Sequence, residues 1–321
     1  MSSCVPRERG RCRVGLRTAL LIVGVLSIGT ACRRSGEPYV VVWLGGDVHL
    51  GAGHADVLET LAPSVRGAAG IVNLEGPIGA VEEFDSVAPI VRALDKVRLV
   101  NAPGVVEMLA RAGVAVVGVA NNHVNDLGPE SAVATVRALE ERGLHPTGGV
   151  AGAARLTIGG TRVAVTAHDL ERGVPATLGE EIAAARRGAD LLICTFHVTV
   201  PPTYLPTDDL RAAVEIALAA GARVVASHGT HAIGPVERRG GAVIAWGLGN
   251  LAFACDCTDE TDAILLTVRI AADSVEAAVI PIEAGLRGEP ARPAPDPNGI
   301  FDLLEAIGSA PIHRDGPRGR F

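Results

Sequence analysis

Seven side chains of the kind that bind divalent metal ions are distributed along this chain, each close to a short apolar run. They are two carboxylates, four imidazoles and one amide: Asp47, His49, Glu75, Asn122, His197, His228 and His231. Oxygen and imidazole nitrogen are the ligands that Mn, Fe and Zn ions accept in proteins. A set of this composition suits two divalent ions that share one bridging carboxylate.

His123 and Asp126 follow Asn122 closely and suggest proton transfer. They come after an apolar run at residues 114–117 and before Pro129, which can open a helix. An imidazole can give a proton to a leaving group, and a carboxylate behind it can hold the imidazole in place. We therefore predict that His123 is a general acid and that Asp126 orients it.

The elements that must position these residues alternate between strands and helices. Apolar, β-branched runs predict strands at residues 39–44, 70–74, 114–119, 190–195, 223–226, 242–246, 263–270 and 275–280. Helical patterns cover residues 103–111, 129–142, 179–187, 207–220 and 298–307. The first five strands each lead into a candidate residue, and ligands commonly bind at the carboxyl ends of strands in α/β proteins. The sequence therefore predicts an α/β protein.

Five motifs occur in a fixed order and together resemble one protein family. They are Gly46-Asp47-Val, Asn73-Leu-Glu75, Asn121-Asn-His123 with Asp126, His228-x-x-His231 followed by Pro235-Val-Glu237, and Gly247-Leu-Gly-Asn250-Leu-Ala-Phe253. This order is similar to the poly-γ-glutamate capsule biosynthesis family, CapA, a branch of the calcineurin-like metallophosphoesterase superfamily. The resemblance runs from about residue 40 to the last predicted helix.

The resemblance implies a fold, a metal site and a reaction. The fold would be a four-layer α-β-β-α sandwich of the metallo-dependent phosphatase type. One metal would be held by Asp47, His49 and His231, the other by Asn122, His197 and His228, with Glu75 as the bridge. A hydroxide between the two metals would be the nucleophile and His123 the general acid. Substrates would be a phosphoester or an anionic surface polymer, and partners could include membrane-bound capsule synthase subunits.

Two departures from the family pattern bear on its function. His197 is followed by Val-Thr-Val-Pro-Pro202, where the family usually has Trp-Gly-x-Glu, so the wall of the cleft and the family's ordinary substrate are in doubt. His49 stands where many members have an apolar residue, and this difference favours bound metal. Asn250 is expected to close a turn beside the site rather than to bind metal.

The amino-terminal residues predict export. Arginines at positions 7 to 17 precede an apolar run at residues 19–28 that is too short to span a bilayer comfortably, as in a signal peptide. We expect a signal peptide over residues 1–31, a lipidated Cys32, a tether over 32–38, one domain over 39–310 and a polar tail over 311–321. Ordinary cleavage after Ala31 is the alternative. The protein is then expected in the cell envelope.

Composition argues against a nucleic-acid-binding protein and leaves open a non-catalytic binding protein. The net charge is −7, aromatic residues make up 3% and no long basic run occurs, so nucleic-acid binding has no electrostatic basis. Cys255 and Cys257 are expected to be two thiols in a loop, because a structural zinc site needs about four ligands. The alternative function is a non-catalytic envelope lipoprotein that binds an anionic polymer within a surface-polymer assembly complex.

Overall fold

The computed structural model describes residues 39–53, 56–80 and 97–321. The chain divides into a short unit, Met1–Gly36, and a second unit, Glu37–Phe321, and all that follows concerns the second. The predicted signal peptide, Cys32 and tether lie outside the described residues. Within the described ranges, no helix combines the length and the apolar character that crossing a bilayer requires.

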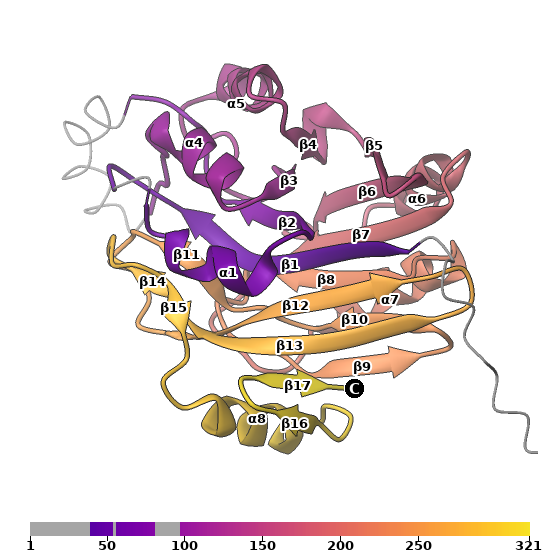
Figure 1. Ribbon diagram of the computed structural model, residues 1–321. Coiled ribbons are helices and arrows are strands. Elements are labelled where there is room, and N and C mark those ends of the chain that lie inside the picture. The colour runs from indigo at the N-terminus through magenta and orange to yellow at the C-terminus, as the bar shows by residue number, and fades with distance from the viewer. Residues whose placement is uncertain (1–38, 54–55, 81–96) are drawn as a thin grey trace, which may run out of the picture. The chain divides into compact units, whose positions relative to one another are not determined.

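The larger of two sheets has eleven strands, with β1 near its middle (Figure 1). Its strands are β1 (Val40–His49), β2 (Ala69–Leu74), β3 (Val114–Gly118), β4 (His145–Thr147), β11 (Asn250–Phe253), β12 (Asp262–Ile270), β13 (Val275–Glu283), β14 (Gly285–Leu286), β15 (Arg292–Pro293), β16 (His313–Asp315) and β17 (Arg318–Arg320). The order along its main path is β16-β17-β13-β12-β1-β2-β3-β4, and β11 also pairs with β1. Because β1, β2 and β3 are parallel, their carboxyl ends lie at one edge.

The smaller sheet has six strands, in the order β5-β6-β7-β8-β10-β9. They are β5 (Ala154–Ile158), β6 (Thr161–Asp169), β7 (Leu191–His197), β8 (Val224–His228), β9 (Val236–Arg239) and β10 (Ala242–Ala245). Strands β6, β7, β8 and β10 are parallel, and β5 joins β6 through the tight turn at Gly159 and Gly160. The two sheets therefore each present a row of parallel strand ends.

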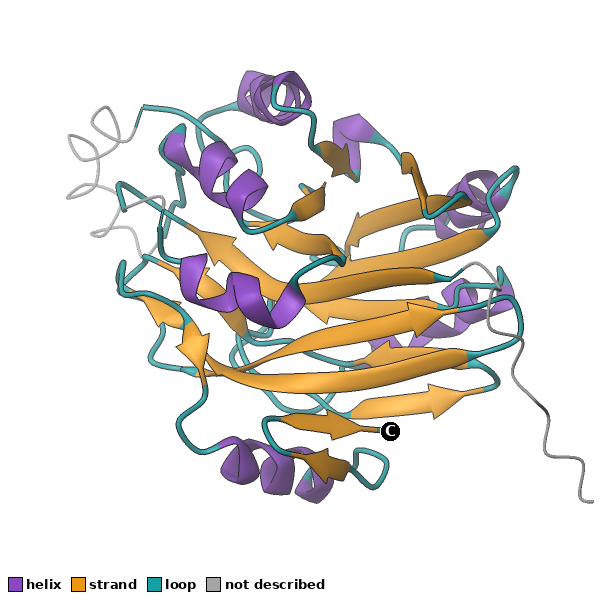
Figure 2. Cartoon of the chain, in the orientation of Figure 1, coloured by secondary structure: helices purple, strands orange, loops and turns teal. Residues whose placement is uncertain are grey.

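Helices cover the outer faces of the two sheets (Figure 2), except the last helix, Pro297–Ala306, whose buried residues join the apolar cluster between the sheets. They are α1 (Ala62–Val65), α4 (Gly104–Arg111), α5 (Pro129–Glu141), α6 (Leu178–Arg186), α7 (Asp208–Ala219) and α8 (Pro297–Ala306), with the 3-10 turns η1 (Glu59–Leu61) and η2 (Gly149–Ala151). Thr207 caps α7, and its hydroxyl accepts a hydrogen bond from the Leu210 amide at 3.2 Å.

Three buried apolar clusters show how these layers stack. The first joins Trp43 on the larger sheet to Met108 on α4. The second joins Leu44 to Ile193 and thus lies between the two sheets. The third packs α6 and α7 on the smaller sheet around Phe196. The order helix, sheet, sheet, helix confirms the predicted α-β-β-α sandwich. Because successive side chains of β1 point to opposite faces of the sheet, this strand contributes residues to both the first and the second cluster.

The predicted polar tail over residues 311–321 is wrong. Strands β16 and β17 form a hairpin, and β17 pairs with β13, extending the larger sheet. Arg318 and Arg320 are exposed, while Gly319 between them packs on Phe301 of α8, where a methyl group would lie 2.7 Å from the ring. The polar side chains of β17 lie on its exposed face, so a polar composition alone does not distinguish this hairpin from a tail.

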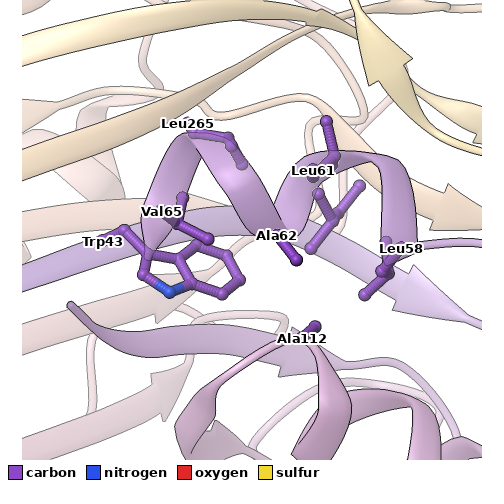
Figure 3. A pocket seen from close by; sticks show the side chains of 8 residues that line it. Trp43, Leu58, Leu61, Ala62, Val65, Ala112 and Leu265 are labelled. Atoms are coloured by element: carbon purple, nitrogen blue, oxygen red, sulfur yellow. The ribbon is translucent and has the colours of Figure 1, made fainter. Parts of the chain in front are cut away.

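The expected pair of free thiols is wrong as well, because Cys255 and Cys257 are joined by a disulfide in the bend after β11. Figure 3 shows a separate feature, a narrow apolar crevice between α1 and the larger sheet that is lined by Trp43, Leu61 and Val65. Its volume is about 10 Å³, which is room for about one water molecule. The crevice is thus too small for a ligand.

The buried thiol of Cys194 is expected to be inert. Cys194 is fully buried on β7, and burial raises the pKa of its thiol to about 12, so the reactive thiolate is scarce at roughly pH 8. We expect a thiol reagent to leave Cys194 unmodified in the native protein and to modify it in denaturant, as read by peptide mass spectrometry. Rapid labelling of the native protein under the same mildly alkaline conditions would contradict this burial.

Candidate metal centre

The candidate residues converge because they lie at the ends of parallel strands in both sheets. Asp47 and His49 lie at the carboxyl end of β1, and Glu75 follows β2. His197 and His228 end β7 and β8, which are neighbours in the smaller sheet. The Gly229 amide donates to Asp47 Oδ2 at 2.8 Å, so the turn after β8 in one sheet is fastened to β1 in the other.

Five of the seven predicted ligands form one cluster. Candidate ligand atoms of Asp47, Glu75 and His231 lie within 4.8 Å of one another. His197 Nε2 lies 3.4 Å from Glu75 Oε1, and His228 Nδ1 lies 3.6 Å from Asp47 Oδ1. These side chains come from β1, β7, β8 and the turns after β2 and β8, so the fold brings together residues that the sequence separates widely.

His49 and Asn122 adjoin this cluster in different ways. His49 Nε2 is 3.1 Å from the Val100 carbonyl oxygen, and its ring lies 5.5 Å from that of Phe253. Its other ring nitrogen, Nδ1, is buried without a hydrogen-bond partner, and so is Asn122 Oδ1. Neither residue is shown in direct contact with the other five, so their assignment as ligands stays a prediction.

Buried polar atoms without hydrogen-bond partners gather at this centre. Across the described residues there are nine such atoms, and six belong to predicted ligands: His49 Nδ1, Glu75 Oε2, Asn122 Oδ1, both ring nitrogens of His197 and His228 Nδ1. Each buried group of this kind costs about 1–3 kcal/mol unless a partner compensates. A divalent cation is a partner that carboxylate, amide and imidazole atoms all accept, so the residues present fit metal ions.

The charge states of two of the imidazoles, His49 and His228, suit metal binding. Burial lowers the pKa of His49 to about 4, and it lowers the pKa of His228 to about 4 as well, so both rings are neutral near pH 7 and keep a lone pair. His197 and Glu75 differ, because burial opposes the charge on both, but Asp169 and Glu75 outweigh it for His197 and His197 outweighs it for Glu75. The pKa of His197 is raised and that of Glu75 is lowered.

His123 and Asp126 form the predicted pair. His123 Nδ1 donates to Asp126 Oδ2 at 2.7 Å, and the same oxygen accepts a hydrogen bond from the Leu99 amide at 2.7 Å. Burial lowers the pKa of His123, but the hydrogen bond to Asp126 and the charge of Glu75 more than offset this, so the pKa is raised. The arrangement leaves Nε2 of a readily protonated ring to face a ligand, as a general acid requires.

Two asparagines that the sequence analysis did not assign to the site hold Asp47 and the His123 turn. Asn73 Nδ2 donates to Asp47 Oδ1 at 2.8 Å, and Asn121 Nδ2 donates to Asn73 Oδ1 at 3.2 Å. Asn121 Oδ1 accepts from the His123 amide at 3.2 Å. These amides thus link the ends of three adjacent strands and fix the direction of the Asp47 carboxylate. Both asparagines occur in the family motifs, in Asn73-Leu-Glu75 and Asn121-Asn-His123, and this was the sign in the sequence that they belong to the site.

Asn250 is the third residue whose role was not foreseen. It does not close a turn but begins β11, is fully buried, and lies opposite Asp47 in the sheet. Its Nδ2 donates to two carbonyl oxygens, those of His231 and Glu260, at 3.4 Å each. Its Oδ1 must therefore face His231 Nδ1, 2.9 Å away, and that nitrogen must carry the proton. Asn250 thereby leaves the lone pair of His231 on Nε2.

Close packing explains why the first and last motifs occur together. A methyl group on Gly46 would lie 1.9 Å from the Gly249 carbonyl oxygen, which accepts a hydrogen bond from the Asp47 amide at 3.2 Å. Only glycine lets β1 and the start of β11 approach this closely. His231 has a positive φ of 52°, an uncommon backbone conformation for a residue other than glycine and one that often occurs at functional sites.

A comparison with protein-family models identifies a family that matches most of the chain. The model of the bacterial capsule synthesis protein PGA_cap matches residues 41–255, which include all the candidate ligands and the His123–Asp126 pair. A search of curated proteins gives no match.

Solved structures resemble the chain only distantly. A hypothetical protein from Thermus thermophilus is 14% identical, with a TM-score of 0.47, over 75% of this chain and 99% of its own. A putative 5'-nucleotidase from Staphylococcus aureus in complex with alpha-ketoglutarate is 12% identical, with a TM-score of 0.47, over 84% of this chain and 58% of its own. A Vps29 single mutant from Entamoeba histolytica is 12% identical, with a TM-score of 0.29, over 76% of this chain and 92% of its own. Structural similarity at this level does not support an inference about function.

Proposed function

This chain belongs to the bacterial capsule synthesis protein family PGA_cap, and from that premise we propose that it is a metal-dependent hydrolase of the phosphoesterase type. The observation that carries the proposal is the gathering of unpartnered buried ligand atoms beside a hydrogen-bonded His123–Asp126 pair. A purely structural cluster would need no proton donor with a free ring nitrogen. A binding protein for an anionic polymer would need no such donor either.

The proposed roles follow the positions of the side chains. Asp47, His49 and His231 would hold one divalent ion and Asn122, His197 and His228 the other, with Glu75 between them. Two such ions supply charge to stabilise an oxyanion and lower the pKa of bound water. Asn73 and Gly229 keep the two oxygens of Asp47 in place, because each donates one hydrogen bond to them, at 2.8 Å.

His123 is proposed to protonate the leaving group. Asp126 holds the Nδ1 proton, so the proton that is transferred is the one on Nε2. The leaving oxygen takes this proton as its bond to the substrate breaks, and the ring is left neutral. The raised pKa of His123 keeps the ring protonated closer to neutral pH than a free histidine would be.

The biological setting that we propose is the synthesis of a capsule or other cell-surface polymer. A phosphoester or an anionic polymer such as poly-γ-glutamate would be the substrate. An exported protein anchored through Cys32 would meet such a polymer, and membrane-bound synthase subunits would be its partners. These elements rest on the family and on the amino-terminal sequence.

The proposal is tested by metal content and hydrolysis measured on the same preparation. We expect about two ions per chain after reconstitution with Mn, Fe or Zn, as read by elemental analysis. Hydrolysis of p-nitrophenyl phosphate, bis-p-nitrophenyl phosphate or poly-γ-glutamate should rise with bound metal and disappear with a chelator. A protein that binds no metal and cleaves none of these compounds, yet still binds the polymer, would favour the non-catalytic alternative.

A further inference from the structure

A second pocket, lined by none of the predicted metal ligands, lies between α6 and the loop that follows β4. Its volume is about 550 Å³, within the range of small-molecule sites. Small residues leave this space: three glycines and four alanines line it, together with Arg155, Thr166, His168 and Glu181. None of these residues is a predicted metal ligand. The pocket therefore needs an explanation of its own.

The floor of this pocket is formed by the end of β6. Thr166 and His168 are two residues apart on the strand and so lie on the same face. The His168 side chain is only 10% exposed, its Nδ1 lies 3.4 Å from Glu181 Oε2, and its Nε2 is buried without a hydrogen-bond partner. The Glu181 side chain is 52% exposed, so its carboxylate is the acceptor beside His168 that a ligand in the pocket can reach.

The chemistry of the floor favours a hydrogen-bond donor. Burial lowers the pKa of His168 more than Glu181 raises it, so the ring is neutral near pH 7. Its Nδ1 then donates to the Glu181 carboxylate. That carboxylate attracts an N–H group, and a protonated amine matches both its charge and its capacity to accept hydrogen bonds.

The other end of the pocket carries the opposite charge. Arg155 donates from Nη1 to the Arg187 carbonyl oxygen at 3.1 Å and from Nη2 to that of Ala184 at 3.0 Å. These bonds place its guanidinium near the carboxyl end of α6, where Ala184 lies about one helical turn beyond Glu181 along the chain. Two of its five N–H groups are used in this way, so others can bind a carboxylate.

We propose that this pocket binds a free α-amino acid, with the ammonium group toward Glu181 and the carboxylate toward Arg155. A zwitterion complements both charges, whereas an anion would meet the Glu181 carboxylate and a cation would meet Arg155. The site is independent of the proposed hydrolase activity. It does adjoin the metal centre, because Asp169, next to His168, has a carboxylate oxygen 3.8 Å from His197 Nδ1.

The experiment uses the whole protein, freed of metal so that an amino acid cannot bind through a metal ion. The twenty standard amino acids are screened by thermal shift, and any that stabilises the protein is titrated by calorimetry. We expect at least one to bind with one site per chain. Its N-acetyl derivative, which lacks the ammonium group, and its amide, which lacks the carboxylate, should each bind at least about tenfold more weakly.

Matched variants on α6 locate the binding. Ala184→Leu fills the pocket and Glu181→Gln removes its negative charge, so each should weaken binding about tenfold or more. Ala183→Leu and Glu180→Gln change neighbours that do not line the pocket, and both should bind as the wild type does. Binding that is unchanged in both pocket variants, or lost in Asp47→Ala at the metal centre, would overturn the proposal. So would a screen in which no amino acid binds.

Discussion

Replacing His123 with alanine is expected to lower kcat for phosphoester hydrolysis by about 10²–10⁴-fold, because a positioned general acid contributes that much. The effect should depend on the leaving group. An alkyl or phenyl ester needs a proton on its leaving oxygen and should lose the full factor. A p-nitrophenyl ester leaves as a stable anion and should lose much less. Steady-state kinetics with both kinds of ester measures the difference.

Metal content separates this role from a structural one. His123→Ala should keep its bound ions, since His123 is not among the proposed ligands. Asn125 lies in the same turn, is exposed, and provides a control, so Asn125→Ala should behave as the wild type does. Asp126→Asn should show a smaller loss than His123→Ala, because the imidazole remains but loses its carboxylate partner. An equal loss for both kinds of ester would argue against proton donation by His123.

The sequence predicted an α/β fold and the convergence of candidate residues because both depend on short-range patterns, whereas the four layers were implied by the family resemblance. Apolar runs that end in a polar residue identify the ends of strands, and parallel pairing then brings those ends to one edge. Asp47 and Glu75 are examples, since β1 and β2 are adjacent and parallel. The family motifs supplied the rest of the expected site, including the spacing of His228 and His231.

The roles of Asn73, Asn121 and Asn250 could not be deduced from the sequence. These residues act through contacts between segments that are distant in the chain, and no local pattern predicts such contacts. Asn250 orients His231 only because β11 inserts beside β1, far from its neighbours in sequence. Asn73 and Asn121 occur in motifs, but a sequence does not show which atom donates to which. The carboxyl-terminal hairpin was missed for a similar reason, because the pairing of β17 with β13 depends on a distant strand.

Replacing Asp47 with alanine is expected to abolish metal binding and, with it, hydrolysis. Asp47 is fully buried and lies 3.6 Å from both His228 Nδ1 and His231 Nδ1, so it contacts both histidines of one motif. Changes to residues that merely support ligands typically reduce metal affinity by about 10–100-fold, and loss of a direct ligand should exceed that. Calorimetric titration with Mn or Zn ions, together with elemental analysis, measures the change.

Thermal stability gives an independent reading of the same substitution. An ion present at about 100 times its Kd stabilises the folded protein by about 2.7 kcal/mol, so the wild type should melt several degrees higher when metal is added. Asp47→Ala should lose this shift. It should also be less stable without metal, because Asn73 Nδ2 and the Gly229 amide lose their acceptor.

The control is Asp190→Asn, which removes a carboxylate that pairs with Arg162 on the surface and should keep the metal-induced shift. If Asp47→Ala bound metal as the wild type does, Asp47 would be a hydrogen-bonding residue of the core and the two-ion site would have to be built without it.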